Sequence, residues 1–450
     1  MQTPGRFTAA FAARGLGTLK AQNAAPALRD IVDKRQRDPA VVIEATRALA
    51  GLRDLSSRPL FEKIVAEPAT DPTLRFETAN ALAALHDPES LDFIIDLMSD
   101  PAPSIRGAAI RALAAIDSET FLTTLSGMDP DRDWTVRTAQ ADALAMLPGA
   151  QGEARLVAML QDRDQRVIPA VLRALVAAKA PNAERILMDQ LKVDDFVVRA
   201  AAANGLASLK ARSAIPALVE AYQAAAGDST YVARAAMLTA ANTIDAAAAR
   251  ALLQTALQDK DWAVRVRAAM LFRDQGITDS AAAIRPAPVR PLDEATQRTL
   301  LAPQFSPHAF IQLDRGTIEL ELAITDAPLT VANFMELARK GFFNGVAIHR
   351  VVPDFVIQDG DPRGDGEGGP GYTIRDELNQ LPYLRGTVGM ALDWKDTGGS
   401  QFFITHSPQP HLDARYTTFG RVVNGMELVD RVQPGDVIRR VQIWDGTTLR

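Results

Sequence analysis

Apolar positions recur at helical spacing over about the first 280 residues. Ala and Leu repeat three and four residues apart, as in Ala79–Leu85. A common frame has Asp, then Arg four residues later and Leu seven residues after that. Frame positions are Arg75, Arg106, Arg137, Arg199, Arg234 and Arg265, with Val42 and Ile168 as substitutes. The frames at 75, 106, 137, 168 and 199 are evenly spaced, which predicts two short helices per repeat.

The turns between predicted helices carry Asp-Pro or Asp-x-Asp, as in Asp131–Asp133, Asp162–Asp164 and Asp259–Asp261. A carboxylate at such a turn accepts the free amide protons of the next helix. A calcium loop is the alternative, but the third acidic position and the loop glycine are missing. We therefore expect helix caps, each before the second helix of a pair.

Evenly spaced repeats of two short helices resemble HEAT-like repeats, including the short kind of bilin-lyase-type proteins. Such repeats stack into a solenoid, because one helix pair cannot bury its own apolar face. The arginines at 75, 106, 137, 199 and 265 resemble the ladder that ties neighbouring HEAT repeats together, which we favour over anion binding. For Trp134 and Trp262 we expect packing against the next repeat rather than partner anchoring.

The start of the chain matches a later repeat. Gly15–Ala21 followed by Ala25–Leu28 parallels Gly205–Ala211 followed by Ile215–Leu218. Residues before Lys20 are therefore interpreted as the second helix of a repeat whose first helix is missing. We predict a solenoid over 1–280 with about eight helix pairs, the first incomplete, and leave open whether the native N-terminus is present.

Beyond the repeats the hydrophobic period changes. A proline-punctuated linker is expected over 281–307. From Phe310 the period is two, which predicts two half-buried strands joined by a turn at Asp314–Gly316. One helix is expected from about Thr330 to Lys340, and the remainder is typical of short strands and glycine-rich loops in a closed β structure.

A series of motifs follows in residues 308–450. They are Asn333-Phe334, Ile348–Asp361, Gly371–Ile374, Asp376-Glu377, Gly389–Ala391, Gly399–Ile404, His411–Asp413 and Phe419–Val422. In order and spacing this series resembles the cyclophilin-type peptidyl-prolyl isomerases. The resemblance implies a closed antiparallel β-barrel with two capping helices, which with the solenoid makes a multidomain chain. It also implies cis-trans isomerisation of X-Pro bonds in protein clients, in aid of folding.

The chemistry suits these residue types. An X-Pro bond rotates slowly because of its partial double-bond character, and a catalyst must favour the twisted state, whose nitrogen accepts a hydrogen bond. A rigid, always charged donor such as Arg350 can do this without a nucleophile, cofactor or metal. By resemblance Arg350 and Gln358 are catalytic, Gln358 holding the substrate backbone. The implied substrate-binding residues are Phe355, Val356, Ala391, Leu392, Gln401, Phe403, His411, Leu412 and Tyr416.

Four of these positions depart from the common family pattern: Val356, Leu392, His411 and Tyr416. The last three support an alternative, a non-catalytic proline-binding scaffold or chaperone. A solenoid enzyme acting on a small molecule or bilin is a third hypothesis, which the repeats do not favour, because they lack a histidine cluster and an acid–base pair. The preferred hypothesis is an isomerase whose solenoid binds a protein partner.

Two local patterns near Arg350 have a second interpretation. His349 is expected to be a hydrogen-bonded core histidine, since the reaction transfers no proton. Gly366–Gly371 fits a dinucleotide-binding glycine pattern by letter, but it is followed by a predicted strand, Tyr372–Ile374, instead of a helix. We expect a mobile loop near the site.

Composition narrows the partners. The net charge is -6, so nucleic acid is not expected, and proline-containing peptides and a protein bound to the solenoid are. Cysteine is absent, and the five histidines show no metal-ligand spacing. No apolar run is long enough to span a membrane. We expect a soluble protein and leave open the bacterial periplasm or the cytoplasm.

Overall fold

The computed structural model describes residues 5–35, 38–147, 151–285, 294–446 and 449. It contains two compact units, Met1–Leu209 and Lys210–Arg450. This division differs from the predicted solenoid limit at 280, because the last repeats belong to the second unit. The predicted linker 281–307 contains part of η6 (Asp279–Ala283) and α18 (Glu294–Leu301), while its residues 286–293 lie outside the described residues.

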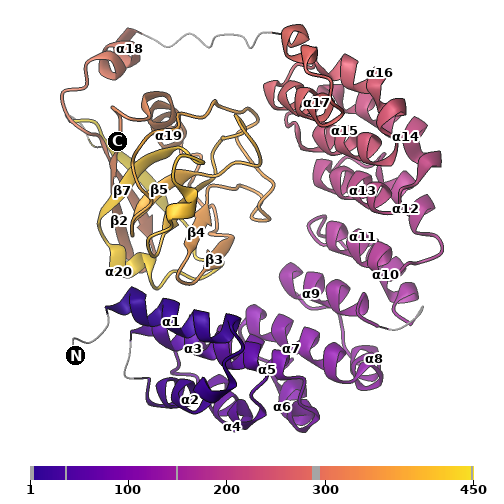
Figure 1. Ribbon diagram of the computed structural model, residues 1–450, viewed down its shortest axis with the longest axis vertical. Helices are drawn as coiled ribbons and strands as arrows, with labels where there is room; N and C mark the ends of the chain where they lie inside the picture. The colour runs from indigo at the N-terminus through magenta and orange to yellow at the C-terminus, as the bar shows by residue number, and fades with distance from the viewer. Residues whose placement is uncertain (1–4, 36–37, 148–150, 286–293, 447–448, 450) are drawn as a thin grey trace. The chain divides into compact units, whose positions relative to one another are not determined.

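The first unit consists of helices. They are α1 (Arg6–Thr18), α2 (Ala25–Lys34), α3 (Pro39–Leu52), α4 (Arg58–Ala66), α5 (Pro72–Leu85), α6 (Leu91–Leu97), α7 (Pro103–Ile116), α8 (Ser118–Ser126), α9 (Trp134–Leu144), α10 (Glu153–Met159), α11 (Ile168–Ala177), α12 (Ala183–Gln190) and α13 (Phe196–Ser208), with short turns η1 (Gln22–Ala24), η2 (Leu55–Ser57) and η3 (Pro88–Ser90). The frame-bearing helices α3, α5 and α7 pack on one another in sequence (Figure 1). This stacking confirms the predicted helical repeats.

The sequence match to a later helix pair shows which helix of the first pair comes first in its repeat. Residues 15–28 parallel residues 205–218, and in the structure these segments span the ends of α1 and α13 and the starts of α2 and α14 (Ile215–Ala224). Since α13 carries the frame residue Arg199, α1 holds the place of a first helix and α2 that of a second. The Asp-containing turns precede the first, frame-bearing helix of a pair.

Several of the predicted caps are present. Asp38 accepts from the amide of Ala40 at the start of α3, and Asp71 accepts from that of Leu74 in α5. Asp133 and Asp195 cap α9 and α13 in the same way. The aspartate at the start of each Asp-x-Asp pair has another partner, which is the arginine of the preceding repeat.

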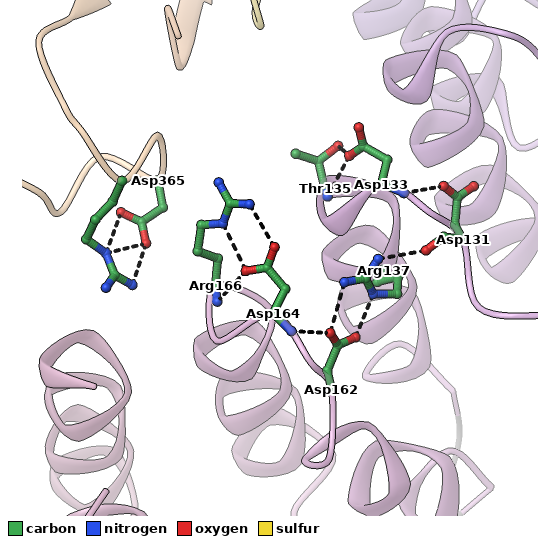
Figure 2. A network of polar contacts seen from close by, with 9 residues as sticks. Asp131, Asp133, Thr135, Arg137, Asp162, Asp164, Arg166 and Asp365 are labelled. Atoms are coloured by element: carbon green, nitrogen blue, oxygen red, sulfur yellow. Dashed lines mark hydrogen bonds and ion pairs between the residues drawn. The ribbon is translucent and has the colours of Figure 1, made fainter. Parts of the chain in front are cut away.

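Arg137 shows how this contact is built (Figure 2). Its Nε donates to Oδ2 of Asp162 at 2.6 Å and its Nη2 to Oδ1 at 2.9 Å, while its Nη1 donates to the carbonyl of Asp131 at 2.7 Å. Arginine and aspartate are 25 positions apart in the chain, and both side chains are buried. The same separation, which we call the rung spacing, joins Arg75 to Asp100, Arg106 to Asp131 and Arg234 to Asp259. We call each such pair a rung; the rungs at Arg75, Arg106 and Arg137 confirm the predicted ladder, and Arg234 adds a rung that was not predicted.

Two of the frames that depart from this pattern lie between Arg137 and Arg234. Ile168 replaces the arginine, and the residue at the rung spacing from it is Val193, so donor and acceptor are missing together. Ile168 is buried, and we call these two apolar positions at the rung spacing the apolar rung. Arg199 keeps the arginine but has Ala224 at the rung spacing, and its Nη1 donates to the carbonyl of Val193 at 2.7 Å. The predicted ladder therefore lacks an aspartate rung at Arg199.

The predicted packing of Trp134 is confirmed. Its ring lies beneath the guanidinium of Arg166, which belongs to the next repeat, with 4.4 Å between Cζ and the ring centroid. A guanidinium over an indole face is a favourable cation–π arrangement. This tryptophan therefore joins two neighbouring repeats.

The second unit begins with helices and ends in a sheet. Its helices are α14, α15 (Val232–Ile244), α16 (Ala246–Ala256), α17 (Trp262–Asp274), α18, α19 (Pro328–Arg339) and α20 (Met426–Val429), with turns η4 (Arg212–Ala214), η5 (Ala225–Gly227), η6 and η7 (Pro410–Leu412). Its strands are β1 (His308–Leu313), β2 (Gly316–Leu322), β3 (Arg350–Val352), β4 (Val356–Asp359), β5 (Thr387–Met390), β6 (Phe402–Thr405), β7 (Thr418–Asn424) and β8 (Arg440–Trp444).

The strands form one curled antiparallel sheet in the order β3-β4-β6-β5-β7-β2-β1-β8. In the predicted first hairpin, Leu313 pairs with Gly316, and Ile318, Leu320 and Leu322 all face the core. The two ends of the sheet are brought together just before the edge strands, where Ala347 bridges Val437. The sheet therefore curls into the predicted barrel-like form, closed at this point by a short bridge.

Two helices cap the sheet, as predicted, although α20 is a single turn. Phe334 of α19 lies at the centre of the core and contacts the rings of Phe343, Phe402 and Phe419. The N-terminus of α19 is capped from a distant loop: Glu377 accepts from the amides of Leu329 and Thr330 at 3.0 and 2.6 Å. This contact attaches the helix to the loops that surround the candidate site.

Candidate active site

The site begins with the hairpin of β3 and β4. In this ladder Arg350 is paired with Gln358, so the two side chains lie on the same face. Nη1 of Arg350 donates to Oε1 of Gln358 at 3.2 Å, and its guanidinium lies 5.7 Å from the ring centroid of Phe355. Arg350 remains exposed. The hairpin thus presents an exposed cation that Gln358 and Phe355 contact.

Gln401 extends this polar chain into the neighbouring loop. Nε2 of Gln358 donates to Oε1 of Gln401 at 3.0 Å. Nε2 of Gln401 in turn donates to the carbonyls of Gly366 and Gly368 at 2.7 and 2.9 Å. Because an amide oxygen accepts and an amide nitrogen donates, the two glutamines have a defined orientation. This polar row of Arg350, Gln358 and Gln401 links the hairpin to the glycine-rich loop.

An apolar cluster lies beside this polar row. Val356, Tyr383, Phe403 and Leu412 are buried, and Phe355, Ala391 and Tyr416 pack against them. Phe355 stacks on His411, and the ring of Phe403 meets Tyr416 edge-on and Tyr383 face-on. Such a wall of aromatic and branched side chains suits a proline ring.

Tyr383 was missed by sequence reasoning. It lies in an irregular segment before β5 and is 1% exposed, stacked on Phe403 with centroids 5.5 Å apart. Gly389 makes this arrangement possible, because a Cβ there would collide with both the Phe403 ring and the Tyr383 hydroxyl. The neighbouring Gly389-Met390-Ala391 motif was the one available signal. Its glycine leaves room for the two rings.

The glycine-rich loop after β4 is organised by Asp361. This side chain is 1% exposed and accepts from the amides of Arg363, Asp365 and Gly366 at 2.7, 2.9 and 2.5 Å. Gly368 passes so close that a Cβ there would collide with the Asp361 carboxylate. The loop is tied from within by Asp361 and from outside by Gln401.

His349 differs from its expectation. Both of its ring nitrogens are buried, and neither has a hydrogen-bond partner in the part of the chain that the structure describes. The expected hydrogen-bonded core histidine is therefore wrong, since the neighbouring loop brings no acceptor to the ring. Burial lowers the pKa of His349, so the ring is neutral at pH 7.

The structure brings together most of the residues singled out from the sequence. Arg350, Gln358 and Gln401 form the polar row, and Phe355, Val356, Ala391, Phe403, His411, Leu412 and Tyr416 form or border the apolar wall. Leu392 follows Ala391 directly but is half-buried and outside the buried cluster. No helix among the described residues is both long and apolar enough to cross a membrane.

Comparisons with known proteins agree with this geometry. Residues 309–446 match the model of the cyclophilin type peptidyl-prolyl cis-trans isomerase family. Residues 65–145 match HEAT repeats, and 198–224 match the PBS lyase HEAT-like repeat. The chain is therefore a fusion of these two kinds of sequence.

Each of the following relatives matches less than a third of this chain. A peptidyl-prolyl cis-trans isomerase of Synechococcus elongatus is 48% identical over 30% of this chain and 94% of its own length. Peptidyl-prolyl cis-trans isomerase B of Bacillus subtilis is 49% identical over 30% and 95%. A crystal structure of a cyclophilin type isomerase from Cryptosporidium parvum is 31% identical, with coverages of 31% and 98% and a TM-score of 0.30. With HEAT-type repeats before it, the C-terminal part of this chain belongs to the cyclophilin-type peptidyl-prolyl cis-trans isomerases.

Proposed function

We propose that Arg350 stabilises the twisted X-Pro bond while Gln358 holds the substrate backbone. The observation that carries this proposal is the exposed guanidinium of Arg350, held by Gln358 and Phe355 at the border of the apolar cluster. The barrier to rotation is about 18–20 kcal/mol, and a donor aimed at the pyramidal nitrogen lowers it. Because only one Arg350–Gln358 bond is made, the remaining guanidinium donors are available to substrate.

The proline ring would occupy the cluster of Val356, Phe403 and Leu412. Phe355 and His411, stacked together, would form one border, and Ala391 with Tyr416 another. Gln401 would position Gln358. Leu392 would contribute through its backbone.

The test is cis-trans exchange of an Ala-Pro peptide, measured by NMR with the full chain. Arg350→Ala is expected to reduce kcat/KM by about 100-fold or more, since a preorganised donor to the transition state is lost. Arg440→Ala removes an exposed arginine of β8 and serves as the matched control. Equal rates for Arg350→Ala and wild type would refute the role of Arg350. Peptide binding by wild type without rate enhancement would favour the scaffold alternative.

We also propose that the helical repeats bind the protein client and that the chain aids its folding. A tethered client would expose its prolyl bonds to Arg350 at a high effective concentration. The proposal is supported by the stacked repeats and by single exposed apolar side chains among them, such as Leu55, Met146 and Val157.

A photo-reactive amino acid at each of these three positions, introduced singly into the full chain, tests client binding. A refolding protein rich in proline is expected to crosslink at one or more of them, and an equal amount of folded protein is the control. Further probes are placed singly within residues 308–450. If the client crosslinks only to these probes, the repeats do not bind it, and the proposal for catalysis by Arg350 is unaffected.

A further inference from the structure

Arg265 is the last arginine of the ladder, and its rung is open. It lies in the same frame as Arg137, on α17, and is 1% exposed. Every paired rung has its aspartate at the rung spacing after the arginine, but the residue at that spacing from Arg265 is Arg290. The chain thus repeats the donor without repeating the acceptor.

The atoms of Arg265 separate into two sets. Nη1 donates to the carbonyl of Asp259 at 2.7 Å, as Nη1 of Arg137 does to Asp131. Nε and Nη2 are buried and have no partner among the described residues. In the rung of Arg137 these same two atoms hold both oxygens of Asp162 (Figure 2). What is missing at Arg265 is therefore one carboxylate group in side-on geometry.

The nearby aspartates do not supply the acceptor that Nε and Nη2 of Arg265 lack. Asp259 and Asp261 both accept from Arg234. Trp262 lies over the Arg265 guanidinium, 5.4 Å from ring centroid to Cζ, and offers no acceptor atom. Burial lowers the pKa of Arg265, and the nearby cation Arg285 acts in the same direction. A buried guanidinium with two unpaired N–H groups is costly, and an anion would relieve that cost.

We propose that Nε and Nη2 of Arg265 form a binding site for a carboxylate from outside the described chain. The group takes the place that aspartate holds in the paired rungs. Its source is either an aspartate or glutamate side chain of a bound protein or a free small carboxylate, which have the same planar pair of oxygens. The site lies in the last helical repeat and is independent of the isomerase chemistry.

Hydrogen–deuterium exchange of the full chain, followed by mass spectrometry, tests the site locally. Sodium acetate at ten times its Kd is expected to slow exchange in the α17 peptide about tenfold relative to sodium chloride of equal ionic strength. Arg265→Gln should abolish this slowing. Arg265→Lys, which keeps the charge but loses the side-on pair of donors, should abolish most of it and covers the case in which Arg265→Gln does not fold.

A paired rung supplies the positive control. Asp162→Ala opens the rung of Arg137, so acetate should now slow exchange in α9, which it does not do in wild type. To separate the sources, Ac-Ala-Asp-Ala-NH2 is compared with its Asn counterpart. Tighter Arg265-dependent binding of the Asp peptide than of acetate assigns the site to protein side chains, and binding of acetate alone assigns it to small carboxylates. No Arg265-dependent effect of either probe would overturn the proposal.

Discussion

Gln358 and Gln401 are joined side chain to side chain, with Nε2 of Gln358 donating to Oε1 of Gln401 at 3.0 Å. This bond connects Gln358 on β4, the middle member of the polar row, to the residue that holds the carbonyls of Gly366 and Gly368. The two glutamines therefore link the geometry at Arg350 to that of the glycine-rich loop.

Gln401→Met tests this dependence. Methionine has a similar volume but cannot donate to the two carbonyls or accept from Gln358. We expect kcat/KM for a proline peptide to fall about tenfold, because Gln358 loses its fixed orientation. Amide exchange in residues 361–371 should also become faster. Gln442→Met is the control, since Gln442 accepts from Gln312 and has no bond to the row among the described residues; equal losses in both variants would argue against positioning by Gln401.

Gly389→Ala tests the room behind Phe403. The new methyl group would collide with the Phe403 ring and must displace it. We expect a loss of stability of about 1–3 kcal/mol from overpacking and a lower affinity for proline peptides. Urea unfolding and peptide titration measure the two effects. Gly369→Ala has open space around the new group and should behave as wild type.

Asp359 predicts a dependence of stability on pH. Burial raises its pKa to about 7, and its Oδ2 has no partner in the described part of the chain. Between about pH 4 and pH 7 the folded state holds a proton that the unfolded chain has released, so the contribution of Asp359 to stability is fully present only below about pH 4. That contribution is lost as the pH rises to about 7, by roughly 1–4 kcal/mol.

Asp359→Asn removes this titration. We expect the variant to be more stable than wild type at pH 8, with the difference shrinking toward pH 4. Thermal unfolding across this pH range measures the difference. A constant difference at all pH values would show that the Asp359 carboxyl does not titrate in the folded protein.

The apolar rung predicts how a charged rung can be replaced. Asp162→Val alone leaves the buried Arg137 cation unpaired and should cost about 3–5 kcal/mol. Adding Arg137→Ile copies the pair Ile168 and Val193 and should recover most of the loss, because a well-packed apolar pair can equal a buried ion pair. Urea unfolding followed by circular dichroism compares the single and double variants. A double variant less stable than Asp162→Val would contradict this interpretation.

The sequence predicted those features that follow from periodicity or from motif order. The β1–β2 hairpin was visible because Ile318, Leu320 and Leu322 alternate with polar residues. Most of the candidate site followed from its motif series. Tyr383 did not, because it lies in an irregular segment where no period marks the buried side. The environment of His349 was predicted wrongly, since acceptors near a ring depend on how distant loops pack.

The rungs were also only partly predictable from the sequence, because each one joins two different repeats. Their arginines were predicted from the frame, but their acceptors, in the turn of the following repeat, were interpreted only as helix caps. A local rule can identify Asp133 as a cap, whereas the bond from Arg106 to Asp131 requires knowing which turns meet. Contacts between repeats come from stacking, which the residues of one repeat do not specify.

The apolar rung has a consequence for how this chain can change over evolution. Replacing only one residue of a charged rung leaves the other charge buried and unpaired. An evolutionary change from a charged to an apolar rung through single substitutions therefore passes through an unstable variant. At Ile168 and Val193 both positions are already apolar. Among relatives with these repeats, the two positions of a rung should therefore vary together, so that paired substitutions at the rung spacing become a record of which helices touch.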